Sequence, residues 1–220
     1  MKRLLVLVAL LTAIAAPPLA SAHPLGNFTV NRFSRIEVSG HRIYVRYVLD
    51  LAEIPTFQAR QAGGIDPAEY ARRLAGGAHL RVDGQRSRLV PIAHALAFPE
   101  GAGGLRTTRL EVILRGPRAA GTSRISYRDT NYAGRLGWRE IVVGAHAKSR
   151  SDELRAYPKN LLESPLHVTS VSATLAPTTQ PPPALTPDAT HEQRVVDWLA
   201  GMTDRFAIRS FEDLSLPQGY

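Results

Sequence analysis

Histidine and carboxylate are the residue types in this sequence that could hold a metal ion, because its 220 residues include no cysteine. Without thiolates, a metal site must use His, Asp, Glu or a free amine. If a signal peptide is cleaved after Ala22, the α-amine and imidazole of His23 belong to one residue and can chelate Ni²⁺, Cu²⁺ or Co²⁺ together. Pro24 removes the next amide N–H, so further ligands would have to come from elsewhere. Alternatively, His23 is merely the residue that processing leaves at a frayed terminus.

Asp50 and Glu53 are the second set of residues that could act as metal ligands. They lie three residues apart where a strand is expected to lead into a helix. Two carboxylates there could bind a cation, but they could equally accept hydrogen bonds from the helix N-terminus. We favour this structural role, because capping explains both residues without a ligand.

The remaining histidines do not form a recognisable metal motif. No two of them have the i, i+4 spacing that places two imidazoles on one helix face. His94 alternates with apolar residues and is expected to be a core histidine. No G-x-S-x-G turn and no Gly-rich phosphate loop after a strand is found, so we expect no enzymatic activity. These histidines are His41, His79, His94, His146, His167 and His191.

Residues 1–22 have the pattern of a secretory signal peptide. Lys2 and Arg3 precede an apolar run over residues 4–16, and Ala20-Ser21-Ala22 is a small-x-small cleavage site. An uncleaved anchor is the alternative, but the run is shorter than the roughly 20 residues that span a bilayer. We therefore expect an exported, periplasmic or otherwise extracytoplasmic protein.

The formal net charge is +8, but the basic residues are scattered along the chain. Nucleic-acid binding requires a clustered basic patch, so nucleic acid is not an expected partner. Weak attraction to an anionic membrane surface remains compatible with this charge.

Alternating apolar residues predict a mainly β protein. Residues 28–38, with Phe28 on the apolar face, and residues 43–51 should form an antiparallel hairpin. A short helical insertion is expected at 53–76, where Asp66 can cap a helix that begins at Pro67. Short strands separated by Gly and Pro then favour an antiparallel β-sandwich over residues 23–175. The further predicted strands are 79–82, 89–98, 105–114, 124–128, 138–143 and 166–175.

The C-terminal part of the chain differs in character. Residues 176–189 are rich in Pro and Thr and should form a semi-rigid linker. Residues 190–209 have the pattern of an amphipathic helix, with Trp198 and Phe206 at its apolar side. Residues 210–220 form a tail.

Three segments carry a family resemblance. HPLGNFTVNRFSRIEV, followed by VRYVLDLAEIPTFQ, resembles the extracytoplasmic N-terminal region of NicO-type nickel/cobalt transport proteins. Residues 127–140 form a second similar block, and the linker with the helix from Thr190 onward forms a third. In that family, metal movement is assigned to a membrane part with His-containing helices. No position here matches those ligands, so the chain is expected to be a separate extracytoplasmic subunit or a truncated version of a longer protein.

The resemblance implies an accessory domain for metal handling or gating in nickel/cobalt transport, with a nickel or cobalt ion as its candidate ligand. Its partner would be a polytopic membrane transport protein or the missing membrane part of the same protein. Candidate docking residues are Asp129, Asn131, Trp138, Trp198 and Phe206, although Trp138 is also expected to anchor the core. The alternative is a secreted β-sandwich adaptor that binds protein and no metal.

Overall fold

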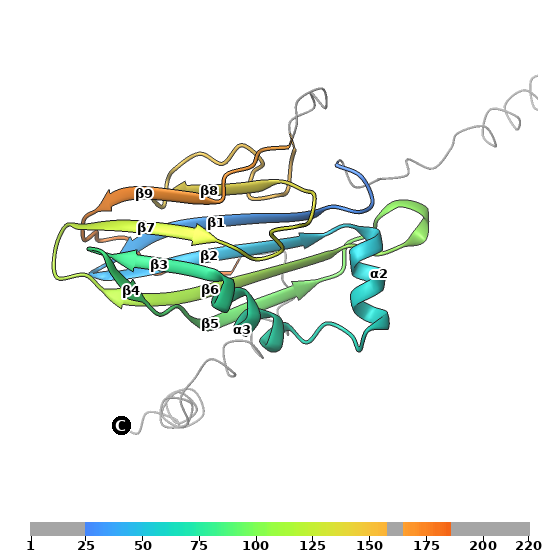
Figure 1. Ribbon diagram of the computed structural model, residues 1–220, viewed down its shortest axis with the longest axis horizontal. Coiled ribbons are helices and arrows are strands. Elements are labelled where there is room, and N and C mark those ends of the chain that lie inside the picture. The colour runs from blue at the N-terminus through green and yellow to red at the C-terminus, as the bar shows by residue number, and fades with distance from the viewer. Residues whose placement is uncertain (1–24, 158–164, 186–220) are drawn as a thin grey trace, which may run out of the picture.

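The computed structural model describes residues 25–157 and 165–185, and two β-sheets pack face to face in this part of the chain (Figure 1). One sheet has the strand order β5-β6-β2-β1-β8 and the other β4-β3-β7-β9. All strand pairs are antiparallel except β1 with β8. The predicted mainly β sandwich with a short helical insertion is confirmed. The strands are β1 Val30–Ser39, β2 Arg42–Leu51, β3 Ala78–Val82, β4 Gln85–Ser87, β5 Val90–Ala97, β6 Thr108–Arg118, β7 Ser123–Asp129, β8 Arg139–Val143 and β9 Ser170–Leu175.

The β1–β2 hairpin is the centre of the five-stranded sheet. Its register runs from Val30 opposite Leu51 to Ser39 opposite Arg42, as the alternation predicts. Gly40 at the turn has a φ of +57°, a left-handed conformation that glycine adopts without a steric cost. Phe28 precedes β1 and is 66% exposed, so its predicted place on the inner face is wrong.

Two helices follow the hairpin, α2 Glu53–Gln61 and α3 Pro67–Gly77. The carboxylate of Asp66 accepts hydrogen bonds from the N–H groups of Ala68 and Glu69, which confirms the predicted cap of α3. The N-cap residue of α2 is Ala52, which makes no side-chain cap hydrogen bond, and Glu53 lies in the first turn of this helix. A short 3₁₀ turn, η1, covers Ala102–Gly104 in the β5–β6 connection.

The turn after β3 leads into a short strand that the sequence pattern did not predict. β4 pairs with β3 at the edge of the four-stranded sheet, whereas β5 pairs with β6 in the other sheet. Gln85, Arg86 and Ser87 are all polar, and so β4 has no apolar alternation. The last predicted strand is also shorter than expected, because Leu166 precedes an isolated bridge at His167 and β9 begins only at Ser170.

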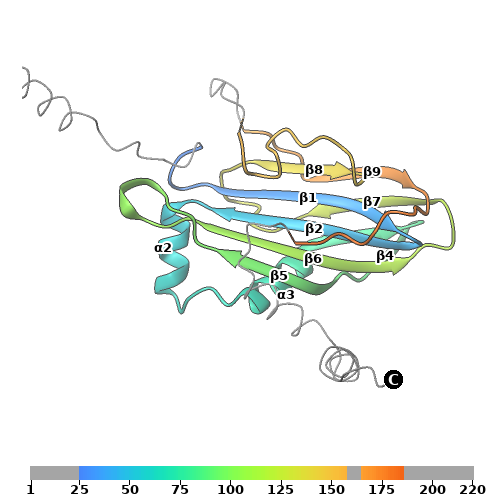
Figure 2. The ribbon, with the colours of Figure 1, turned by 180° about the vertical axis from the view of Figure 1, so that it is seen from behind.

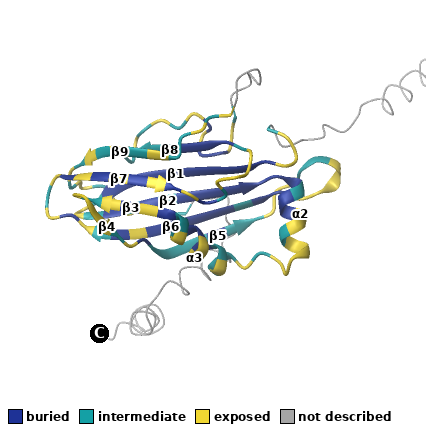
Figure 3. Cartoon of the chain, in the orientation of Figure 1, coloured by how far each residue is buried: buried dark blue, intermediate teal, exposed yellow. Residues whose placement is uncertain are grey.

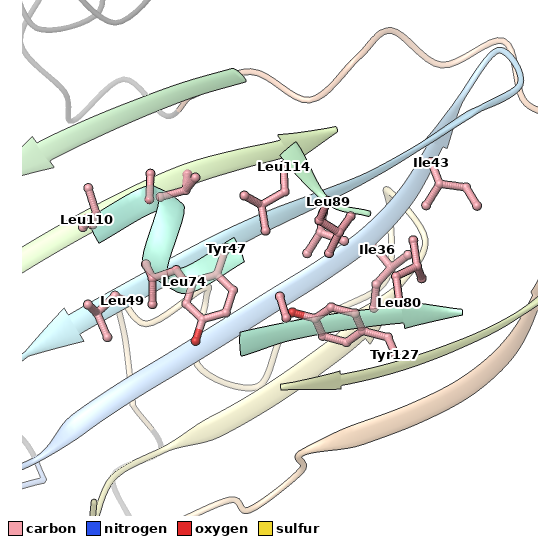
Figure 4. Packing of buried hydrophobic residues seen from close by; sticks show 14 of the residues in the cluster. Ile36, Ile43, Tyr47, Leu49, Leu74, Leu80, Leu89, Leu110, Leu114 and Tyr127 are labelled. Atoms are coloured by element: carbon pink, nitrogen blue, oxygen red, sulfur yellow. The ribbon is translucent and has the colours of Figure 1, made fainter. Parts of the chain in front are cut away.

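The main hydrophobic core lies between the two sheets, and α3 closes it with Ala71 and Leu74 (Figure 4). A second cluster covers the outer face of the five-stranded sheet, where Phe33, Val48, Trp138 and Leu154 pack together. β1 is consequently buried on both faces (Figure 3). The side chains labelled in Figure 4 are Ile36, Ile43, Tyr47, Leu49, Leu74, Leu80, Leu89, Leu110, Leu114 and Tyr127.

Residues 176–185 leave β9 and lie along the outer face of the five-stranded sheet (Figure 2). The N–H of Thr178 donates to the carbonyl of Gly40 at 3.1 Å, and the guanidinium of Arg46 donates to the carbonyl of Ala184 at 2.7 Å. The first part of the predicted linker is therefore attached to the sandwich. None of the described helices is long and apolar enough to cross a membrane.

Candidate docking surface

Large apolar side chains are exposed at one end of the sandwich. They belong to the segment before β1, to α2, and to the β5–β6 and β7–β8 connections, which meet at the right-hand end of Figure 1. Single exposed apolar residues are common, but a group of them indicates an interaction site. We call this group the apolar end. It consists of Phe28 (66% exposed), Phe57 (51%), Phe98 (38%), Leu105 (40%) and Leu136 (80%).

Backbone hydrogen bonds hold three segments together at the apolar end. The N–H of Ile54 at the start of α2 donates to the carbonyl of Asn27 at 3.0 Å, and the N–H of Ala52 donates to that of Thr29 at 3.1 Å. From the other side, the N–H of Val30 donates to the carbonyl of Leu136 at 2.8 Å. The segment that carries Phe28 is therefore fixed between α2 and the β7–β8 connection.

Glu53 attaches the β5–β6 connection to α2. Its side chain is fully buried, and its Oε1 accepts a hydrogen bond from the N–H of Ala102 at 2.8 Å. A Cβ on Gly101 would lie 2.6 Å from the same oxygen, so a larger residue there would require the Glu53 side chain to move. The Arg60 guanidinium of α2 lies 5.6 Å from the centre of the Phe98 ring, which is a favourable cation–π distance.

The predicted docking residues Asp129, Asn131 and Trp138 lie at the base of the β7–β8 connection and are between 6% and 9% exposed. Asn131 Nδ2 donates to the carbonyl of Leu74 and to Asp129 Oδ1, both at 2.9 Å. The N–H of Trp138 donates to Asn31 Oδ1 at 2.8 Å. These residues shape the connection, while Leu136 is the side chain that it exposes. Sequence reasoning identified the block but missed Leu136.

Asp50 contacts other residues than Glu53 does. It is 8% exposed, and its Oδ2 accepts hydrogen bonds from Tyr157 Oη at 2.8 Å and from Asn31 Nδ2 at 3.4 Å. Burial, followed by the charge of Asp50, raises the pKa of the Tyr157 hydroxyl well above its ordinary value. Asp50 therefore anchors the segment that covers the second hydrophobic cluster.

In the part of the chain that the structure describes, no three His, Asp or Glu side chains gather closely enough to hold a metal ion. His41 and His146 line one pocket of about 720 Å³, near Gly40 and Thr178, at the end away from α2. His79 bonds to the hydroxyl of Thr130, and His167 Nε2 lies 2.8 Å from Arg139 Nη1. The predicted residues His23, Trp198 and Phe206, with the whole of the predicted helix 190–209, lie outside the described residues.

Comparison with known proteins gives one match to a short segment. A family model described as "Phosphohydrolase-associated domain" matches residues 166–213. The match covers less than half of the chain, and only β9 and the residues beside it fall in its described part. No curated protein matches the sequence.

Proposed function

We propose that this chain is an extracytoplasmic accessory domain of a nickel/cobalt transport system, and that its apolar end docks on a polytopic membrane transport protein. One observation carries the proposal. The segments that resemble NicO-type proteins contain Phe28, Phe57 and Leu136, and their backbones are joined at the same end of the sandwich. The segments that carry the resemblance thus supply three of the five exposed side chains that define the apolar end.

We propose that the domain acts on the transport protein by binding to it, and that Asp50 and Glu53 do not bind the metal. Asp50 and Glu53 are buried and already accept hydrogen bonds from Tyr157 and Ala102. Burial of one Phe or Leu side chain contributes about 1.5–3 kcal/mol. Two or three such side chains would therefore contribute a substantial part of the free energy that offsets the cost of association with a partner.

The test uses a double variant, Phe57→Ser with Leu136→Ser, in cells that also produce a NicO-type membrane transport protein. We expect docking, measured by site-specific cross-linking, to weaken at least about 30-fold, which corresponds to roughly 2 kcal/mol. Nickel transport by the cells should fall in parallel. Gln85→Ser, on the exposed β4 at the opposite end, is the matched control and should change neither. Normal cross-linking and transport in the double variant would refute the docking proposal.

A separate titration tests whether the domain also handles metal. Calorimetry of the processed protein with Ni²⁺ and Co²⁺ should give heat that is lost in His23→Ala if the terminal amine and imidazole form a chelate. If neither the processed protein nor the His23→Ala variant gives heat, metal handling is excluded. The docking proposal is then tested by the double variant alone.

A second candidate function is a secreted protein-interaction adaptor without metal binding. The match of residues 166–213 to a model described as a phosphohydrolase-associated domain keeps this candidate open, because that description names neither nickel nor cobalt. For an adaptor of this kind, the double variant would leave nickel transport unchanged.

A further inference from the structure

Arg32 is a charged side chain buried inside the sandwich. It is 1% exposed and lies on the inner face of β1, between Val30 and Ser34 in the alternation. Its Nε lies 3.2 Å from Asp129 Oδ2, but none of its three guanidinium nitrogens has a hydrogen-bond acceptor in the described structure. A guanidinium carries five N–H donors, and burying them without acceptors is costly.

Asp129 cannot satisfy this guanidinium alone, because other groups already use its oxygens. Oδ2 accepts a hydrogen bond from Tyr47 Oη at 3.0 Å. Oδ1 accepts hydrogen bonds from the N–H of Asn131 at 3.0 Å and from its Nδ2 at 2.9 Å. The carboxylate balances one positive charge and is almost saturated as an acceptor.

A second buried guanidinium lies beside the first. Arg139 on β8 is the register partner of Arg32, so both side chains leave the same face of the sheet. Arg139 is 7% exposed, and its Nη2 donates to the carbonyl of Ala133 at 2.8 Å. Its Nε is buried without an acceptor. Burial, followed by the charge of Arg32, lowers the pKa of Arg139, which is the direction expected for two neighbouring cations.

The charges in this cluster do not balance. Two guanidinium groups face one carboxylate, and His167 adds no negative charge where its Nε2 meets Arg139 Nη1. Water could accept some of the free N–H groups, but it would leave one excess positive charge in a buried site. A small anion both accepts these hydrogen bonds and neutralises the charge.

We propose that a chloride ion binds between the guanidinium of Arg32 and Nε of Arg139. The ion would link β1 to β8 at the base of the β7–β8 connection, which exposes Leu136. Chloride would therefore stabilise the fold and hold one part of the apolar end in place. The site does not depend on the docking partner, so it stands or falls separately from the proposed function.

Bromide gives the direct test, because it replaces chloride and scatters X-rays anomalously. Crystals of the protein grown or soaked in sodium bromide should show an anomalous peak within hydrogen-bond reach of Arg32 and Arg139. A site that holds only water, with no anomalous peak, would overturn the proposal. This experiment needs no substitution and is unaffected by whether variants fold.

Thermal unfolding gives the energetic test. Chloride in tenfold excess over its dissociation constant should raise the unfolding midpoint by roughly 3–6 °C compared with gluconate at the same ionic strength. Arg32→Met should abolish the difference. Arg128→Gln removes one positive charge from the exposed face of β7 and should respond to chloride like the unmodified protein. Equal midpoints in chloride and gluconate for the unmodified protein would also overturn the proposal.

Discussion

Glu153 is a single side chain that organises the covered outer face of the five-stranded sheet. Its Oε1 accepts a hydrogen bond from Arg35 Nε at 2.9 Å, and its Oε2 accepts one from Arg46 Nη1 at 3.0 Å. The backbone here is strained, since Asp152, Glu153 and Leu154 have φ angles of 46°, 55° and 67°. Such angles cost about 1–3 kcal/mol for each residue unless neighbouring contacts enforce them. The ion pairs of Glu153 with Arg35, Arg46 and Arg155 and the burial of Leu154 supply those contacts.

Glu153→Gln should therefore lower the free energy of unfolding by about 2–3 kcal/mol, because it removes the negative charge paired with the largely buried guanidinium groups of Arg35 and Arg46. Urea unfolding measures this loss. Glu100→Gln is the matched control, since the Glu100–Arg106 pair is largely exposed and should contribute less than about 1 kcal/mol. Equal losses in the two variants would show that the ion pairs of Glu153 do not hold the strained turn.

At the scale of the element, the β7–β8 connection depends on a close approach to β1. Gly137 has a φ of +144°, and a Cβ built there would lie 2.4 Å from the carbonyl oxygen of Val30. Only glycine fits this backbone conformation and this contact. This contact fixes the position of Leu136, because the carbonyl of Leu136 accepts a hydrogen bond from the N–H of Val30.

Gly137→Ala should consequently destabilise the protein by more than about 1 kcal/mol and loosen the connection. Urea unfolding gives the first quantity, and limited proteolysis within residues 130–138 gives the second. Gly134→Ala lies in the same connection, where a Cβ would meet no atom within 4 Å, and should cause no loss of stability. Similar behaviour of the two variants would contradict the importance of the approach to Val30.

The same elements show what the sequence could and could not predict. Apolar alternation in β1 and β2, and the Asp66 cap of α3, depend on local chemistry, and they were predicted correctly. The polar strand β4 has no such pattern, because it is held by pairing with β3 rather than by burial of its own side chains. Phe28 was assigned to the wrong face because alternation does not mark where a strand begins.

The candidate site was only partly predictable, because the exposure of its side chains depends on contacts between segments distant in the sequence. Gly and Asn correctly indicated a loop with a special backbone within residues 127–140, and the structure places it between Asp129 and Arg139. Which of its side chains is exposed depends on tertiary hydrogen bonds, such as those of Asn131 to Leu74 and of Trp138 to Asn31. Arg32 likewise interrupts the apolar face of β1, and its burial depends on Asp129, nearly one hundred residues away.

At the scale of the whole molecule, tyrosine hydroxyls are buried in both hydrophobic clusters. Tyr47 and Tyr127 lie between the sheets, where burial, followed by the charge of Asp129, raises the pKa of each hydroxyl above its ordinary value. Tyr157 lies over the outer face, where burial and Asp50 raise its pKa in the same way. A phenolate at any of these positions would be desolvated beside a carboxylate, so global stability is linked to the protonation of these three groups.

The sign of this linkage predicts alkaline unfolding. An unfolded tyrosine has a pKa near about 10, and the folded values are higher, so the folded state keeps protons that the unfolded state releases. The stabilisation is complete below about pH 10 and is lost as pH rises through the interval up to the folded pKa values. Each tyrosine adds a fall of up to about 1.4 kcal/mol per pH unit in that interval. Urea unfolding at a series of pH values measures the slope.

Tyr157→Phe should reduce the contribution of the three tyrosines by about one third, because it removes one of three linked groups. If phenolate absorbance instead showed these tyrosines ionising in the folded protein at their ordinary pKa, stability above about pH 10 would not depend on them.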